Sequence, residues 1–101
     1  MGSRRQAREN ALQALYQCDT LGEFNKDCVA LYFTSFHGAS EDGAPQTETE
    51  FSRILSLGVV ENLESIDMLI SSCSQNWSLG RMSRVDRNIL RIGAFEICYL
   101  P

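Results

Sequence analysis

Three helix-start signals constrain the fold of this chain more than any other feature of its sequence. They are the pairs Ser3 with Gln6, Thr47 with Glu50, and Ser83 with Asp86. In each pair a hydroxyl can accept a hydrogen bond in the first turn of a helix, and the second side chain can reach back toward it. Apolar residues at helical spacing follow all three pairs, and we predict no strand. The expected fold is therefore all-α, a compact helical bundle of about four helices.

The apolar spacing also gives approximate bounds for these helices. We expect them at residues 4–21, 25–37, 47–73 and 83–100. Gly22 can end the first helix, and residues 38–46, which hold two glycines and a proline, are predicted to form a loop. In the long third helix we expect Gly58 to mark a close helix crossing rather than a bend.

The last helix has two unlike halves. In the first half we expect an apolar face toward the core, made of Val85, Ile89 and Ile92, and a polar stripe made of Arg84, Arg87 and Arg91. After Arg91 the only charged residue is Glu96, so the helix becomes apolar nearly all round. A helix of that kind is normally buried on every side. We therefore expect that the chain lacks a C-terminal part, or that another subunit covers this surface.

Length and composition indicate a single small domain. A chain of 101 residues that is 44% hydrophobic can bury one core, over residues 1–101. We divide it into a three-helix part, residues 1–75, and the start of a truncated C-terminal part, residues 76–101. No apolar run approaches the roughly 20 residues that cross a bilayer, and no signal peptide precedes the first helix. We expect a cytoplasmic protein without a membrane partner.

The cysteines do not suggest a metal or redox site. Cys18, Cys28, Cys73 and Cys98 form no C-x-x-C pair, and the single histidine, His37, has no evident partner for zinc. We expect the four cysteines to be small buried residues in a reducing compartment, and we expect no metal, cofactor or catalytic residue.

Positive charge is concentrated in two short segments. Seven of the nine basic residues lie at Arg4, Arg5, Arg8 and Arg81, Arg84, Arg87, Arg91, although the net charge is -4. Local charge decides whether a phosphate backbone can bind, and arginine offers phosphate a planar fork of donors. The clusters indicate nucleic-acid binding, with solvated helix faces as the alternative.

The first arginine cluster has an unusual position on its helix. At helical spacing Arg4 and Arg8 continue the stripe of Ala11 and Leu15, so we expect the first two turns to project beyond the core. Positive charge near a helix N-terminus also opposes the helix dipole, which makes a purely structural role less favourable.

Three stretches carry a resemblance to a known family. Residues 4–16 have the pattern R-x-x-A-R-x-x-A-x-x-A-L-Y, and residues 82–96 read MSRVDRNILRIGAFE. Together they resemble the NusB family of bacterial transcription antitermination factors, and residues 51–67 are similar to the third helix of that family. The resemblance covers nearly the whole chain outside residues 22–46.

The resemblance implies an all-helical, non-enzymatic RNA-binding protein. Such a protein pairs with the small-subunit ribosomal protein NusE, holds the boxA element of nascent ribosomal RNA transcripts, and helps RNA polymerase to read through terminators. By the match, Arg4, Arg5 and Arg8 lie on the RNA-binding segment, and we add Arg84 and Arg87 to the candidate RNA surface. Tyr16 and Asp86 match the contact with the ribosomal protein. Alternatively, Tyr16 is a core aromatic and Asp86 only caps its helix.

Two other functions stay open at this point. RNA cytosine methyltransferases that act on small-subunit ribosomal RNA carry a similar helical domain, and a third class is a helical protein-interaction module. Family members also continue past the position of Pro101 with further helices, which bear an A-x-x-E-A-type helix and an F-V-N-G-x-L-type motif. We therefore expect a shortened chain that can self-associate as a homo-oligomer through its last helix.

Overall fold

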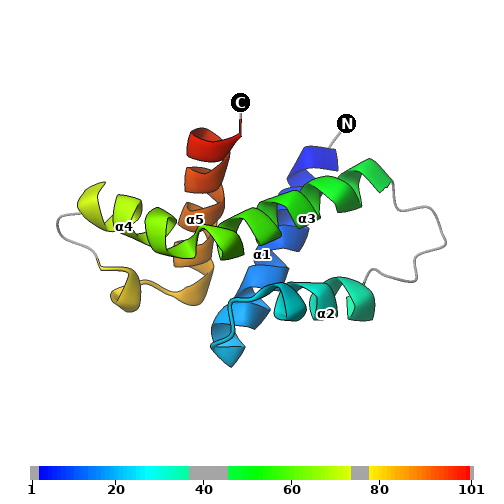
Figure 1. Ribbon diagram of the computed structural model, residues 1–101, viewed down its shortest axis with the longest axis horizontal. Helices are drawn as coiled ribbons and strands as arrows, with labels where there is room; N and C mark the ends of the chain where they lie inside the picture. The colour runs from blue at the N-terminus through cyan, green and yellow to red at the C-terminus, as the bar shows by residue number, and fades with distance from the viewer. Residues whose placement is uncertain (1–2, 37–45, 74–77, 101) are drawn as a thin grey trace.

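The computed structural model describes residues 3–36, 46–73 and 78–100, and its regular elements are all helices (Figure 1). Its elements are α1 (Ser3–Leu21), α2 (Lys26–Phe36), α3 (Gln46–Glu61), α4 (Leu63–Cys73), the 3-10 helix η1 (Leu79–Arg81) and α5 (Arg84–Tyr99). No strand occurs in these residues, which confirms the all-α prediction. None of the helices described is long and apolar enough to cross a membrane.

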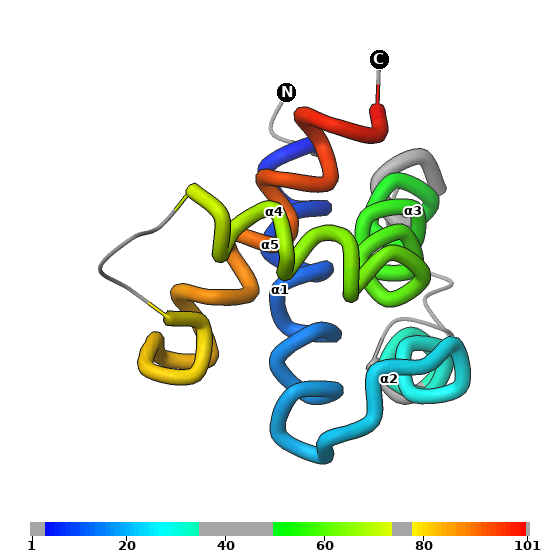
Figure 2. The backbone as a smooth tube through the Cα atoms, turned by 60° about the vertical axis from the view of Figure 1, so that its left-hand side comes forward, coloured from blue at the N-terminus to red at the C-terminus, as the bar shows by residue number. Residues whose placement is uncertain are grey.

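Helix α1 is the central element of the fold. It packs against α2, α3 and α5, and Figure 2 shows it upright with α2 and α3 to one side. Ala7, Ala11 and Ala14 are fully buried along α1, and Ser52 and Ser56 are fully buried on α3. Side chains this small let helix backbones approach closely, so the small residues of α1 explain its central place.

The core forms two clusters that share α1. One joins α1 to α3, α4 and α5; its buried members are Ala11, Leu15, Leu55, Val59, Ile66, Ile70, Ile92 and Phe95. The other joins α1 to α2; its buried members are Ala14, Cys18, Cys28, Val29, Tyr32 and Phe33. Both clusters include residues of α1. The helices that pack on one face of α1 are therefore connected through it to the helix that packs on the other face.

The end of α1 follows the sequence prediction. Gly22 has a φ of +72°, a left-handed conformation that glycine adopts without steric cost. The Gly22 N–H donates to the Asp19 carbonyl at 3.2 Å, and the Glu23 N–H donates to the Cys18 carbonyl at 3.0 Å. This pair of bonds is a Schellman motif, which satisfies carbonyls that the helix end would leave unpaired.

The predicted helix over residues 47–73 is wrong in one respect, because it is divided at Asn62. Figure 2 shows α4 running in a different direction from α3. The Asn62 side chain donates to the Gly58 carbonyl at 2.9 Å, a carbonyl that the Asn62 backbone N–H also contacts at 3.1 Å. A local side-chain bond of this kind competes with the regular helix pattern. Helix α3 begins at Gln46, one residue before the predicted start.

The orientation of α5 differs from the prediction. Asn88, Arg91, Ile92 and Phe95 face inward, at the spacing of a single buried helix face. Val85 is 42% exposed and Ile89 is 50% exposed, although both were expected in the core. The predicted polar stripe is therefore partly internal, because Asp19 and Asp67 on other helices hold Arg87 and Arg91.

The first turns of α1 also differ from the prediction. Ala7 is fully buried and Asn10 is 7% exposed, so these turns pack onto the core rather than project beyond it. The long side chains of Arg4 and Arg8 reach α3 and α5 instead. Their aliphatic stems can lie on the protein while the charged ends stay in water.

The cysteines fall into two groups. Cys18 and Cys28 are buried, as predicted, and burial raises the pKa of the Cys18 thiol to about 12. Cys73 and Cys98 are exposed, so the prediction was wrong for them. His37 lies outside the described residues, and the part of the chain that is described holds no cluster of metal-binding side chains.

The last turns of α5 expose apolar side chains. Ile97 is 82% exposed and Tyr99 is 43% exposed, while Phe95 of the same segment is buried. The expectation that α5 has an uncovered apolar surface is therefore confirmed within the described residues. The Tyr99 ring stacks on the Phe95 ring, with centroids 5.5 Å apart.

Substitution of Gly58 tests the packing of α3 on α5. A Cβ atom at Gly58 would overlap the Phe95 ring, whereas a Cβ at Gly93 would meet no atom within 4 Å. We expect Gly58→Ala to lower the free energy of unfolding by about 2 kcal/mol, and Gly93→Ala to leave it unchanged or raise it by about 0.5 kcal/mol. Urea denaturation would measure both, and equal stability of the two variants would contradict this packing.

Candidate functional site

The arginines of the first α1 turns lie at the surface, and each contacts a different neighbour. The Arg4 guanidinium lies over the Phe51 ring of α3, 4.3 Å from its centroid. Arg5, whose side chain is 84% exposed, has Nε 3.7 Å from a carboxylate oxygen of Glu9. This is a loose pair along one helix and holds Arg5 only weakly. These cations are therefore accessible to an anionic ligand.

Arg8 has a more defined partner on α5. Its Nε donates to Glu96 Oε2 at 2.8 Å and its Nη2 donates to Glu96 Oε1 at 2.9 Å. This hydrogen bond with Glu96 raises the pKa of the Arg8 guanidinium above its ordinary value. The Arg8 side chain is still 47% exposed, so solvent reaches the pair. Arg8 thus remains charged and lies at the surface in contact with a carboxylate.

A groove of about 480 Å³ runs between α1 and α5 beside this pair. Its lining residues are Arg5, Arg8, Glu9, Leu12, Ile89, Ile92, Gly93, Glu96 and Ile97. The charged residues in this list come from the first turns of α1 and from Glu96, and the others are apolar or glycine. The groove thus combines an apolar surface with two arginines and two glutamates.

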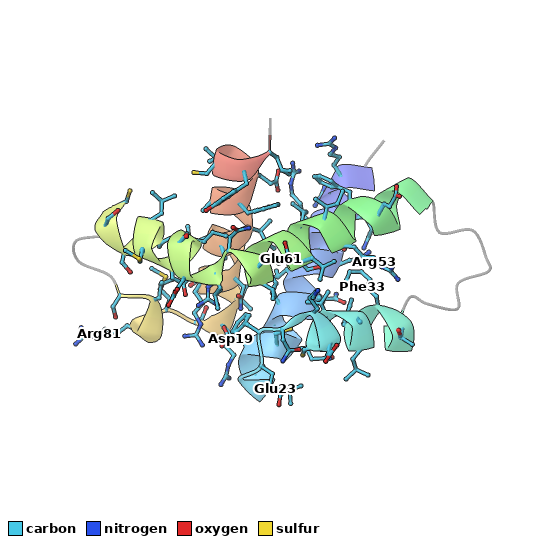
Figure 3. All side chains as sticks on the ribbon, viewed as in Figure 1. Asp19, Glu23, Phe33, Arg53, Glu61 and Arg81 are labelled. Atoms are coloured by element: carbon cyan, nitrogen blue, oxygen red, sulfur yellow. The ribbon has the colours of Figure 1, made fainter. Side chains whose placement is uncertain are left out.

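At the other end of α1, Asp19 organises an ionic cluster, which we define as Asp19, Asp67, Arg87, Asn88 and Arg91. Arg87 donates to both oxygens of Asp19, from Nε at 2.7 Å and from Nη2 at 2.6 Å. Asn88 Nδ2 donates to Asp19 Oδ2 at 3.0 Å. The Asp19 side chain is only 8% exposed, and Figure 3 shows it where α1 meets the beginning of α5. The cluster therefore fixes the register of α1 and α5.

Arg91 extends the ionic cluster to α4. Its Nε donates to Asp67 Oδ1 at 2.8 Å and its Nη2 donates to Asp67 Oδ2 at 2.9 Å, while Nη1 lies 3.5 Å from Asp19 Oδ2. The Arg91 guanidinium also lies over the Phe24 ring, 5.0 Å from its centroid. A buried cation needs such a set of partners, because an unpaired one is strongly destabilising. Arg91 is thus a structural residue that joins three helices.

Electrostatics in the ionic cluster favour the charged forms. The hydrogen bond from Arg87 holds the pKa of the Asp19 carboxyl below its ordinary value, and that from Asn88 lowers it further. The same bond with Asp19 raises the pKa of Arg87. Arg84 lies farther away, with Nε 3.9 Å from Asp19 Oδ1, and its side chain is 48% exposed. Arg84 therefore remains accessible, whereas the Arg87 donors are largely occupied.

The structure places the two candidate partner residues at the surface. Tyr16 is 43% exposed, so the alternative that it is a core aromatic is wrong. Asp86 is exposed near the start of α5, where its backbone N–H donates to the Ser83 hydroxyl at 3.0 Å. This bond confirms that Ser83 caps the helix, and it uses the Asp86 backbone rather than the carboxylate.

Three carboxylates were missed by sequence reasoning. Asp19, Asp67 and Glu96 form the ion pairs with Arg8, Arg87 and Arg91, yet no sequence pattern marked them as the partners of these arginines. Each lies 24 to 88 residues from the arginine that it pairs with. One sequence signal was present, because Asp19 falls one residue after Cys18 on the edge of the buried α1 stripe.

This geometry defines an all-α protein with surface arginines at one end of its central helix and an ionic cluster at the other. A model of the NusB family matches residues 5–101, which is nearly the whole chain. The chain belongs to the NusB family, as the sequence motifs indicated.

Named relatives agree with this assignment. The chain is 49% identical over 96 residues to the transcription antitermination protein NusB of Desulforamulus reducens, covering 95% of this chain and 63% of that protein. It is 39% identical over 99 residues to the protein of the same name from Syntrophus aciditrophicus, covering 98% and 58%. For that of Myxococcus xanthus the identity is 41% over 102 residues, covering 100% and 71%. The chain thus spans about three fifths of the length of the first two relatives. No solved structure matches the chain significantly.

Acid titration tests the ionic cluster. The folded pKa of Asp19 lies below its ordinary value of 3.8, so its stabilising contribution is complete above that value and is lost as the pH falls through the folded pKa. We expect Asp19→Asn to lower the free energy of unfolding at pH 7 by about 3 kcal/mol, because Arg87 loses its carboxylate. The variant should also show a weaker loss of stability below about pH 4. Parallel pH profiles of the two proteins, measured by chemical denaturation, would contradict this role.

Proposed function

We propose that this chain acts in transcription antitermination by binding the boxA element of nascent ribosomal RNA together with the ribosomal protein NusE. The family and the names of the relatives support antitermination rather than the methyltransferase domain or a general interaction module. In this role the protein works in the cytoplasm as part of an RNA polymerase complex. It needs no cofactor, because binding alone is the function.

The observation that carries the proposal is the exposure of Arg4, Arg5 and Arg8 on adjacent turns of one helix. Arginine forks match phosphate geometry, and several adjacent cations can follow an RNA backbone. The groove beside them can accommodate parts of an RNA strand that face away from solvent. Unstacked bases of a single-stranded element would then supply sequence choice, while the phosphates supply affinity.

The candidate contacts with the ribosomal protein lie toward the other end of the same helix pair. The Arg8 contact with Glu96 and the Asp19 contact with Arg87 show that α1 and α5 run antiparallel. Tyr16 lies one turn before Asp19, and Asp86 is adjacent to Arg87. RNA and protein partner would therefore occupy opposite ends of one surface, which lets both bind together.

Exposed apolar residues on the same helix as Asp86 support a protein contact there. Val85 is 42% exposed and Ile89 is 50% exposed on α5. Protein interfaces combine such apolar residues with aromatic anchors such as Tyr16. Of the two further arginines, Arg84 is accessible but lies at the end of the helix pair that we assign to the protein partner, and Arg87 would have to leave Asp19 to bind a phosphate.

The experiment is a binding titration of a short boxA RNA, with and without the ribosomal protein, over a series of salt concentrations. We expect combined substitution of Arg4, Arg5 and Arg8 by alanine to weaken binding at least about tenfold at low salt. The slope of log affinity against log salt should become shallower by about two, because each phosphate contact to a single strand contributes about 0.7.

A second triple variant controls for net charge. Lys26→Ala, Arg53→Ala and Arg81→Ala together remove the same charge, and Figure 3 shows Arg53 and Arg81 on opposite sides of the molecule. This control should retain most of the affinity. Equal losses in the two triple variants would show that the α1 arginines form no specific site, and no binding by the parent chain would contradict the proposed function.

A further inference from the structure

The contact between Arg8 and Glu96 has the geometry that an arginine uses to bind phosphate. Two parallel N–H donors, Nε and Nη2, meet two carboxylate oxygens at 2.8 and 2.9 Å. A phosphate group presents two oxygens to a guanidinium in the same bidentate way. The carboxylate therefore occupies the face of Arg8 that a phosphate would need.

The pair is also placed where it can open. The Arg8 side chain is 47% exposed and that of Glu96 is 20% exposed, so water can solvate both groups when they separate. Exposed ion pairs contribute little to stability, in contrast to the buried pair of Arg87 with Asp19. The groove beside the pair gives a ligand access to the guanidinium.

We propose that Glu96 is a built-in competitor for RNA, and that a backbone phosphate replaces its carboxylate on Arg8 when RNA binds. This inference rests on the proposed function and deepens it, because it names a residue that limits affinity. Arg5 lacks such a competitor: its contact with Glu9 is 3.7 Å long and both side chains are more than half exposed. Arg8 should therefore bind only RNA segments whose contacts with the rest of the protein offset the loss of the ion pair between Arg8 and Glu96.

The test measures affinity for fluorescent boxA RNA with the full 101-residue chain and its Glu96→Gln variant. Glutamine keeps the size of the side chain but removes the charge that holds Arg8. We expect Glu96→Gln to tighten binding by about two- to fivefold, the range that corresponds to release of an exposed ion pair. The salt dependence should steepen by up to about 0.7, the contribution of one phosphate contact.

Glu9→Gln is the matched control. It removes the same charge from the lining of the same groove, but Glu9 makes no bidentate bond to an arginine. Its effect measures the general loss of repulsion between protein and RNA. The gain in RNA affinity from Glu96→Gln should exceed the gain from Glu9→Gln. This difference should disappear in the Arg8→Ala background, because Glu96 then has no arginine to pair with.

Two results would overturn the inference. Equal effects of Glu96→Gln and Glu9→Gln would show that Glu96 acts only through net charge. An excess of the Glu96→Gln effect that persists in the Arg8→Ala background would show that Glu96 does not act through Arg8. In either case the proposed function would stand if the parent chain binds RNA and the variant with Arg4, Arg5 and Arg8 replaced by alanine does not. Failure of the parent chain to bind RNA would reject the proposed function, and the inference with it.

Discussion

The Asp19 carboxylate is the interaction on which the rest of this structure depends. It lies in the last turn of the central helix and is 8% exposed, so it must be paired to remain charged. Arg87, Asn88 and Arg91 of α5 all hydrogen-bond to it. These contacts turn the polar side of α5 inward at that point, and Arg91 carries the connection on to Asp67 of α4.

This constraint separates the arginines of the chain into two kinds. The side chains of Arg87 and Arg91 are 18% and 8% exposed, so their release from Asp19 and Asp67 would leave charges unpaired in the interior. Arg4, Arg5 and Arg8 lie at the surface, so a ligand can replace their contacts with an aromatic ring or a carboxylate at little cost. The arginine clusters of the sequence therefore fall into two groups, one that is structural and one for which we propose RNA binding.

The local parts of the fold were predictable from the sequence, because their causes are local. Ser83 caps α5 and Gly22 ends α1 through contacts within five residues of each, and the alanines of α1 mark its buried face. Gly58 was correctly assigned to a close crossing, since its contact with Phe95 needs only the absence of a side chain.

The parts that could not be predicted depend on contacts between distant segments. The apolar residues alone placed Val85 and Ile89 inside, one position away from the buried face that contains Asn88 and Arg91. Only the positions of Asp19 and Asp67 on other helices decide between these two orientations. The competitor Glu96 is 88 residues from Arg8, so its role could be inferred only from the folded chain.

The most direct test of this account is to observe the arginine side chains while RNA binds. In a nitrogen-15 labelled chain, the Nε–Hε signals report whether each guanidinium keeps its partner. The account predicts that boxA RNA shifts the signal of Arg8 and leaves those of Arg87 and Arg91 unchanged. A shift of the Arg87 and Arg91 signals with an unchanged Arg8 signal would contradict it, because the ionic cluster would then be the RNA site.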